Sequence, residues 1–194
     1  MKKLLSILLI IFFNVIAYSQ LSKQNSVTQE VVGRDTITWV LRENLTIWDI
    51  YIEKDRNRAI EYKRNHPNTL AKEITEVIEA RYFNREGTQR MESILLGCFS
   101  EDDLSKLFKK MSEKSRLRMG VFLQGDGTVL SVDICAFAPI TKSEFLTSTE
   151  VYRFMNNVKK SSFPDLQELP FMYCYIPIWQ HHIKAELERR TRSK

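Results

Sequence analysis

The chain has 194 residues, of which 43% are hydrophobic and 27% are charged, and this is enough for one domain with a packed core. Its formal net charge is +5, and Lys2 and Lys3 supply two of these charges. The remaining +3 equals the five bases less the two acids found between residues 184 and 194. The basic excess therefore lies in the C-terminal tail, which argues against a nucleic-acid-binding face.

Residues 1–19 have the pattern of a secretory signal peptide. Lys2 and Lys3 precede an apolar run over residues 4–17, and small residues occupy the last and third-last positions before a cleavage site after Ser19. The alternative, an uncleaved anchor, would need about 20 apolar residues, whereas the chain becomes polar at Gln20. We expect export to the Gram-negative periplasm, contact with the membrane only before cleavage, and no lipid anchor, because no cysteine lies near the signal.

The next segments are predicted from hydrophobic patterning. Residues 20–34 are polar and are expected to form a flexible leader. Residues 35–114 are predicted to form an N-terminal α+β extension, which begins with two alternating runs, 36–41 and 45–52. Two such runs around a short polar break indicate a β-hairpin. The charged residues 53–68 are expected to be a loop or an exposed, poorly packed helix.

Two helices are predicted in the rest of the extension. Apolar residues recur with helical spacing over residues 70–83. Ser100 followed by Asp103 is an N-cap signature that precedes an amphipathic stripe ending at Met111. The apolar run 91–99, which lies between the two helices, is too short to assign.

Residues 117–136 form two alternating runs around Gly125-Asp126-Gly127. This glycine cluster is predicted to be a tight β-turn, because Asp-Gly supplies the positive φ that a hairpin turn needs. A dinucleotide loop would lead into a helix, and a phosphate loop would continue with Gly-Lys-Ser/Thr. A calcium loop would need further carboxylates beside Asp126. None of these patterns is present in the sequence.

A helix and a final strand are predicted after the hairpin. Thr141 with Glu144, and Thr147 with Glu150, are two capping signatures. The second precedes the apolar stripe of a helix that Phe163-Pro164 ends. Residues 171–179 then alternate again. One side of this strand is apolar and is expected to face the core, and the other side carries Phe171, Tyr173 and Tyr175.

Residues 115–180 therefore read as a strand, tight turn, strand, helix and strand. The crossover makes the last strand parallel to the second, with room for the first between them, so the expected sheet order is second, first, third. The predicted fold class is α+β: a split β-β-α-β sheet with one helix packed on it, preceded by an N-terminal β-hairpin and two helices. Residues 181–194 are expected to be a basic C-terminal tail.

This unit resembles the C-terminal domain of the TonB and TolA type over about the last third of the chain. The resemblance rests on the strand, Gly-Asp-Gly, strand pattern of residues 116–134 and on the stretch 158–164 before a terminal strand. It implies a periplasmic adaptor without enzymatic activity, whose final strand pairs with a partner peptide. The chain has no proline-rich spacer and no Tyr-Pro motif before the domain, so a free-standing exported relative fits better than an energy transducer.

The final strand is expected at the edge of the sheet, because Pro170 and Pro177 bracket it and proline is tolerated at edges. An edge offers unpaired backbone groups to a partner strand. The candidate partner-binding residues are Phe171, Tyr173 and Tyr175. Two alternatives stay open: the prolines protect the edge from pairing, or the hairpin at residues 36–52 covers it.

Cys98, Cys135 and Cys174 are an odd number of cysteines for an exported chain. Cys135 and Cys174 would lie on strands separated by a third, about 9 to 10 Å apart, which is too far for a disulfide. All three cysteines lie in apolar segments that raise the pKa of a thiol. A small periplasmic hydrolase using a cysteine such as Cys98, or one of the histidines, is kept as the alternative function.

The remaining candidate sites have ordinary structural explanations. His182 and Glu186 would share a helix face, but two ligands do not make a metal site. The acids at 101–103 lie at the start of a predicted helix, where negative charges interact favourably with the helix dipole. Asp35-Thr36-Ile37 resembles a short O-glycosylation acceptor motif. Trp39, Trp48 and Trp179, with the strand tyrosines, could form a binding surface, but each lies in a predicted strand, where aromatic residues commonly serve as packing residues. We expect a non-enzymatic binding protein without a cofactor, metal or nucleic-acid partner.

Overall fold

The computed structural model describes residues 26–42, 47–66, 84–113, 116–137, 145–163 and 170–194. The predicted signal peptide, the helix predicted at 70–83 and the Thr141 capping signature lie outside the described residues.

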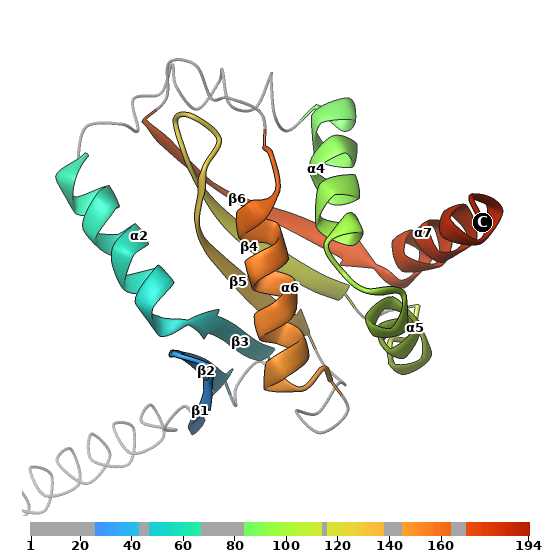
Figure 1. Cartoon of the computed structure of the whole chain (residues 1–194), viewed down its shortest axis with the longest axis horizontal. Helices are drawn as coiled ribbons and strands as arrows, with labels where there is room; N and C mark the ends of the chain where they lie inside the picture. The colour runs from blue at the N-terminus through green and yellow to red at the C-terminus, as the bar shows by residue number, and fades with distance from the viewer. Residues whose placement is uncertain (1–25, 43–46, 67–83, 114–115, 138–144, 164–169) are drawn as a thin grey trace, which may run out of the picture.

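The described chain folds around one six-stranded antiparallel sheet (Figure 1). Its strands follow the order β1-β2-β3-β5-β4-β6 across the sheet. Their bounds are β1 Ser26–Val32, β2 Asp35–Arg42, β3 Ile47–Ile52, β4 Arg116–Gln124, β5 Val129–Phe137 and β6 Phe171–Trp179. With its helices, the sheet confirms the predicted α+β class. The sheet is larger than expected, because the three N-terminal strands join it.

The topology of β4, β5 and β6 is the predicted one. β4 pairs antiparallel with both β5 and β6 and therefore lies between them. Gly127 has a φ of 81°, and the Thr128 amide donates to Asp126 Oδ1 at 2.9 Å. The glycine cluster is therefore a turn closed by an aspartate side chain.

The N-terminal strands correct two expectations. Residues 26–32 are not part of a flexible leader, because they form β1 and pair along their whole length with β2. β2 and β3 form the predicted hairpin, but β3 pairs with β5. The hairpin therefore extends the side of the sheet opposite to β6 and does not cover the β6 edge.

Five helices accompany the sheet in the described part of the chain: α2 Glu53–Asn65, α4 Arg85–Gly97, α5 Glu101–Lys110, α6 Ser148–Lys160 and α7 Gln180–Arg192. Two of them begin at the predicted caps. Ser100 accepts from the Asp103 amide, and Thr147 with Glu150 forms a capping box. The short apolar run 91–99 belongs to α4, which begins earlier, at an Asn84 cap.

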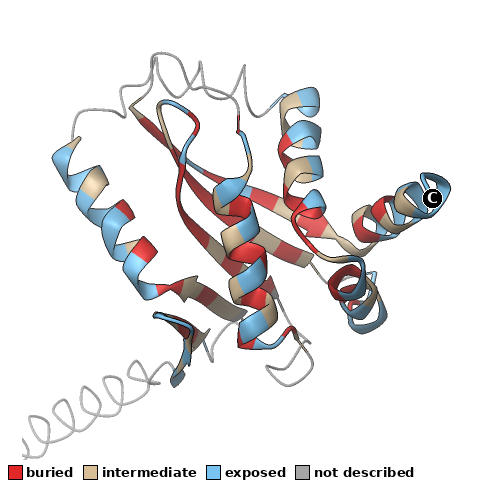
Figure 2. Cartoon of the chain, in the orientation of Figure 1, coloured by how far each residue is buried: buried red, intermediate tan, exposed pale blue. Residues whose placement is uncertain are grey.

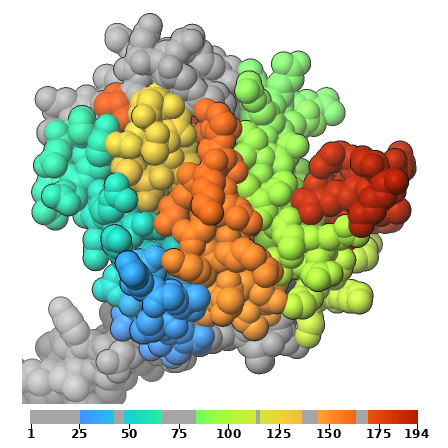
Figure 3. Space-filling view, in the orientation of Figure 1, coloured from blue at the N-terminus to red at the C-terminus, as the bar shows by residue number. Residues whose placement is uncertain are grey.

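The two faces of the sheet are covered differently. The core face carries Met119, Ile134 and Ile176 in register, all fully buried, and α6 packs on it through its predicted stripe from Val151 to Val158. Figures 1 and 3 show α6 lying across the front of the sheet, and Figure 2 shows the buried residues on the strands behind it. Residues of the N-terminal extension and of the C-terminal unit share this core.

The opposite face, here called the open face, carries Tyr51, Asp133, Gly120 and Tyr175 in register. Only α2 lies on this face among the described helices, through a small cluster of Ala59 with Phe122, Leu130 and Phe171. The charged segment after β3 is thus a helix and not a loop, and it packs on the sheet through Ala59, which corrects the expectation of a poorly packed helix.

The C-terminal segment is not a solvated tail. Residues 180–192 form α7, in which Ile183 is fully buried and Glu186 is 6% exposed. The Arg190 guanidinium donates to the carbonyl oxygens of Leu96 at 2.9 Å and Phe99 at 3.0 Å. These bonds attach α7 to the end of α4, so most of the basic excess belongs to a packed helix.

Candidate binding groove and edge strand

The three predicted partner-binding residues lie on the open face of β6, but their exposure differs. Phe171 is 8% exposed, Tyr173 is 36% exposed and Tyr175 is 48% exposed. The Phe171 ring stacks on Phe122 of β4, with centroids 5.1 Å apart. Phe171 is therefore a packing residue, whereas the two tyrosines are available for contact.

Tyr173 reaches across the sheet. Its hydroxyl donates to Asp133 Oδ2 on β5 at 2.8 Å, although β4 lies between the two strands. Gly120 of β4 makes this contact sterically feasible, because a Cβ there would lie 2.5 Å from the Tyr173 hydroxyl. The glycine thus lets the phenol ring lie close to the backbone.

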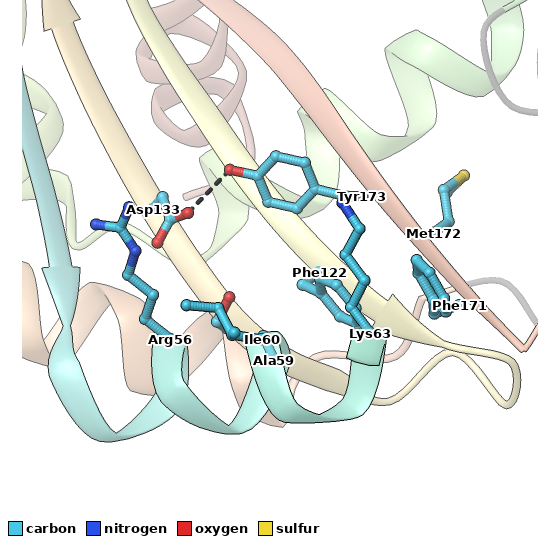
Figure 4. A pocket seen from close by; sticks show the side chains of 10 residues that line it. Arg56, Ala59, Ile60, Lys63, Phe122, Asp133, Phe171, Met172 and Tyr173 are labelled. Atoms are coloured by element: carbon cyan, nitrogen blue, oxygen red, sulfur yellow. Dashed lines mark hydrogen bonds between the residues drawn. The ribbon is translucent and has the colours of Figure 1, made fainter. Parts of the chain in front are cut away.

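A groove of about 390 Å³ lies between α2 and the open face (Figure 4). Its size is at the lower end of the range that small-molecule sites occupy. Three strands and one helix supply its walls, and most of its lining is apolar. The lining residues are Arg56, Ala59, Ile60, Lys63, Phe122, Ser131, Asp133, Phe171, Met172 and Tyr173.

The electrostatics of the groove are set by Arg56, Lys63 and Asp133. The Arg56 guanidinium lies over the Tyr51 ring, 4.0 Å from its centroid. Burial raises the pKa of Asp133, while the Tyr173 hydrogen bond and the nearby Arg56 lower it. The Oδ1 atom of Asp133 is buried and has no hydrogen-bond partner in the structure. Such an oxygen favours the neutral acid.

The outer edge of β6 has a defined backbone register. The Pro170 carbonyl points toward the β4 side, where it accepts from the amide of Gly125, the residue that follows β4. The Trp179 amide instead points away from β4 and lies 3.5 Å from His182 Nδ1. Even-numbered residues of β6 therefore bond to β4, and odd-numbered residues point their backbone groups outward. Pro177, which has no N–H, fits the outward set. Phe171, Tyr173 and Tyr175 each present an outward N–H and C=O, and none of the described strands lies on that outer side of β6.

The cysteines give no support to the hydrolase alternative. All three are free thiols, and Cys135 and Cys174 lie on the strands that flank β4, as predicted. Cys98 Sγ contacts the Ile94 carbonyl and the Ser161 hydroxyl, each at 3.1 Å. Burial raises the pKa of each thiol, to about 12 for Cys135 and Cys174. A thiolate nucleophile is disfavoured at all three positions.

His182 and Glu186 do not converge on a metal site. His182 Nδ1 lies 3.1 Å from Glu92 of α4, and the Glu186 carboxylate is held by Arg189 and Arg190 at 2.8 Å. No group of three or more metal-ligating side chains is assembled among the described residues. Of the acids at 101–103, Asp103 is buried and paired with Arg153, which is a structural role.

The tryptophans do not form a common surface. Trp39 is 1% exposed and donates from Nε1 to Ser148 of α6 at 2.9 Å. Trp48 packs edge-on against Trp39. Trp179 lies at the other end of the sheet, beside Arg116. Thr36 of the short glycosylation-like motif lies within β2.

Sequence reasoning missed the contribution of α2 to the groove. Arg56, Ala59, Ile60 and Lys63 come from a helix of low amphipathicity, so no apolar stripe indicated that it packs on the sheet. Gly120 was also missed. A glycine in the middle of a predicted strand, opposite two tyrosines on the next one, is the signal that indicates a close approach.

The chain has a distant structural similarity to a known protein but no sequence match. No protein-family model matches the chain, and no curated protein sequence is similar to it. A crystal structure of a DUF5043 family protein from Bacteroides uniformis aligns with a TM-score of 0.47 and 10% identity, over 80% of this chain and 92% of that one. A similarity at this level supports no conclusion on function. Among the described residues, no helix is long and apolar enough to cross a membrane.

Proposed function

We propose that the mature chain is an exported, non-enzymatic binding protein that adds an extended peptide to the outer edge of β6. The observation that carries this proposal is the position of β6 at the end of the described sheet, with the backbone groups of three alternate residues directed outward. Main-chain hydrogen bonds supply affinity in strand addition, and alternate side chains supply specificity.

The side chains beside this edge suit a peptide partner. Tyr173 and Tyr175 pack edge-to-face, with centroids 4.8 Å apart, on the open face. The Arg118 guanidinium lies 5.4 Å from the centroid of the Tyr175 ring. A partner strand would place every second side chain next to this pair of aromatic rings, where flat or apolar groups pack well.

Pro177 limits the usable length of the edge. It removes one outward donor toward the end of β6, and the Trp179 amide is directed to His182. Natural edge strands use proline to discourage pairing. Here it confines pairing to residues 171–175, so a short extended segment is the favoured partner.

The edge is tested by a substitution that removes one outward N–H. Tyr175→Pro deletes the donor at a position of the same register as Pro177, so the ladder with β4 is retained. Tyr175→Ala is the matched control, since it removes the side chain and keeps the N–H. An array of short extended peptides with alternating apolar residues, screened by fluorescence polarisation, should yield sequences that bind the Ala variant and not the Pro variant.

Several outcomes are informative. Self-association of the chain that Tyr175→Pro abolishes would identify a second copy as the partner strand. Equal binding by the two variants, or no peptide bound by the unmodified chain, would overturn the edge proposal. Export is tested separately, by N-terminal sequencing of the protein recovered from the periplasm, where the proposal expects Gln20 as the first residue.

A further inference from the structure

The groove between α2 and the open face contains cationic and apolar side chains of α2 that strand addition at β6 does not need. We infer that it binds a small anionic molecule with a flat, apolar body, of which an aromatic carboxylate is the simplest example.

The apolar part of the site consists of two exposed walls and a buried floor. Ile60 of α2 is 48% exposed and Tyr173 of β6 is 36% exposed, and both line the groove. The stacked rings of Phe122 and Phe171, inclined by 13°, lie below them. Ala59 leaves depth at the helix side because its side chain is short. A planar ligand placed here would remove apolar surface from water on both of its faces.

The charge of the groove selects the sign of the ligand. Arg56 and Lys63 are seven residues apart, which is about two helical turns, so both lie on the side of α2 that lines the groove. Figure 4 shows both side chains rising from the same helix face. Stacking on Tyr51 restrains the Arg56 guanidinium, and this lowers the entropy cost of fixing it on a ligand.

Asp133 is the one acid among the ten described lining residues, whereas α2 supplies the two cations Arg56 and Lys63. One oxygen of Asp133 accepts from Tyr173 and the other is buried without a partner. The two cations on α2 therefore outweigh it, and an anion is favoured over a cation. The volume of about 390 Å³ suits a molecule of one or two rings and is too small for a folded partner.

The test uses the mature chain with 2-naphthoate as the probe and 2-naphthamide as its neutral isostere. We expect 2-naphthoate to bind in the range below about 1 mM by calorimetry, and the amide to bind about tenfold more weakly. Amide chemical shifts should change along α2 and β6. Arg56→Gln and Lys63→Gln should each weaken naphthoate binding several-fold, whereas Arg58→Gln, on the same helix outside the groove, should leave it unchanged.

Three results would overturn the inference: no binding of 2-naphthoate at about 1 mM, equal affinity for the amide, or chemical-shift changes confined to another part of the molecule. Circular dichroism of each variant checks that it is folded, and Ile60→Asp provides a second variant, which should exclude the anion by repulsion. Tyr175 does not line the groove, so the Tyr175→Pro variant should bind naphthoate normally. The proposal for the groove and the proposal for the β6 edge can thus be refuted independently.

Discussion

Tyr173 on β6 and Asp133 on β5 are joined by a 2.8 Å hydrogen bond that passes over Gly120 on the strand between them. Adjacent strands lie about 4.8 Å apart, so the phenol spans two strand spacings. A side chain on β4 at this point would occupy the path of the ring. The bond couples the edge strand to the middle of the sheet on the same face as the groove.

Gly120→Ala should therefore destabilise the fold by about 1–3 kcal/mol, because the new Cβ would lie 2.5 Å from the Tyr173 hydroxyl and force the ring to move. Urea unfolding measures the loss. In a Tyr173→Ala background the same glycine substitution should cost less, since the nearest obstructing ring is absent and the remaining close atom, Tyr175 Cε1, would lie 3.2 Å from the new Cβ. Equal costs in the two backgrounds would show that Gly120 is required for another reason.

Arg153 of α6 and the buried Asp103 of α5 form an ion pair in which one guanidinium nitrogen of Arg153 donates to both carboxylate oxygens, at 2.8 and 2.7 Å. Arg153→Ala should cost about 1–3 kcal/mol of unfolding free energy, because a carboxylate that is 1% exposed would lose its cation. Arg153→Lys should recover part of the loss, since it keeps the positive charge but not the planar guanidinium. A fully stable alanine variant in chemical denaturation would contradict this role.

The packing of α7 gives a prediction with a control in the same helix. Arg190→Ala removes bonds to two carbonyl oxygens at the end of α4 and one to Glu186, and should cost about 2 kcal/mol. Arg192 is 82% exposed in its side chain and lies 3.9 Å from Glu188, so Arg192→Ala should change stability by less than about 0.5 kcal/mol. Thermal unfolding of both variants measures the difference. If α7 were a solvated tail, the two would behave alike.

The parts of the fold that could be predicted are those in which local signals and packing agree. Thr147 and Glu150 form the predicted cap, and the stripe from Val151 to Val158 is buried as expected. The period-two runs around Asp126 predicted both strands and their order beside β6. Patterning of this kind reports which face of an element is buried, and here that was sufficient to place the C-terminal unit.

The parts that could not be predicted depend on contacts between distant segments. Residues 26–32 alternate weakly, and Val27 and Val31 remain largely exposed, so little in the sequence separates an edge strand from a polar leader. The sequence of α7 is dominated by charge, and its packing rests on Ile183 and on hydrogen bonds to the backbone of α4 and α5. The groove needs α2 above β4, β5 and β6, a juxtaposition that no single segment encodes.

Glu92 of α4 provides a prediction for the pH dependence of stability. Its carboxylate lies 3.1 Å from His182 of α7, and burial raises the pKa of Glu92 from 4.5 to about 7. Burial also lowers the pKa of His182, so the buried pair favours the neutral forms of both groups. The folded chain then holds the Glu92 proton over a pH range in which the unfolded chain has lost it. The stability contributed by this group is complete below about pH 4.5 and is lost as the pH rises through 7.

Glu92→Gln removes this titration and keeps the shape of the side chain. The variant should gain stability relative to the unmodified chain between pH 5 and pH 8, by about 1 kcal/mol once partial exposure and the nearby imidazole are allowed for. His182 is present in both proteins, so its own titration largely cancels in the comparison. Glu86→Gln, an exposed position in the first turn of the same helix, is the control and should show no such trend. Urea unfolding across this range measures the difference in unfolding free energy between Glu92→Gln and the unmodified chain. If this difference stays constant or shrinks with rising pH, ionisation of Glu92 does not destabilise the folded chain.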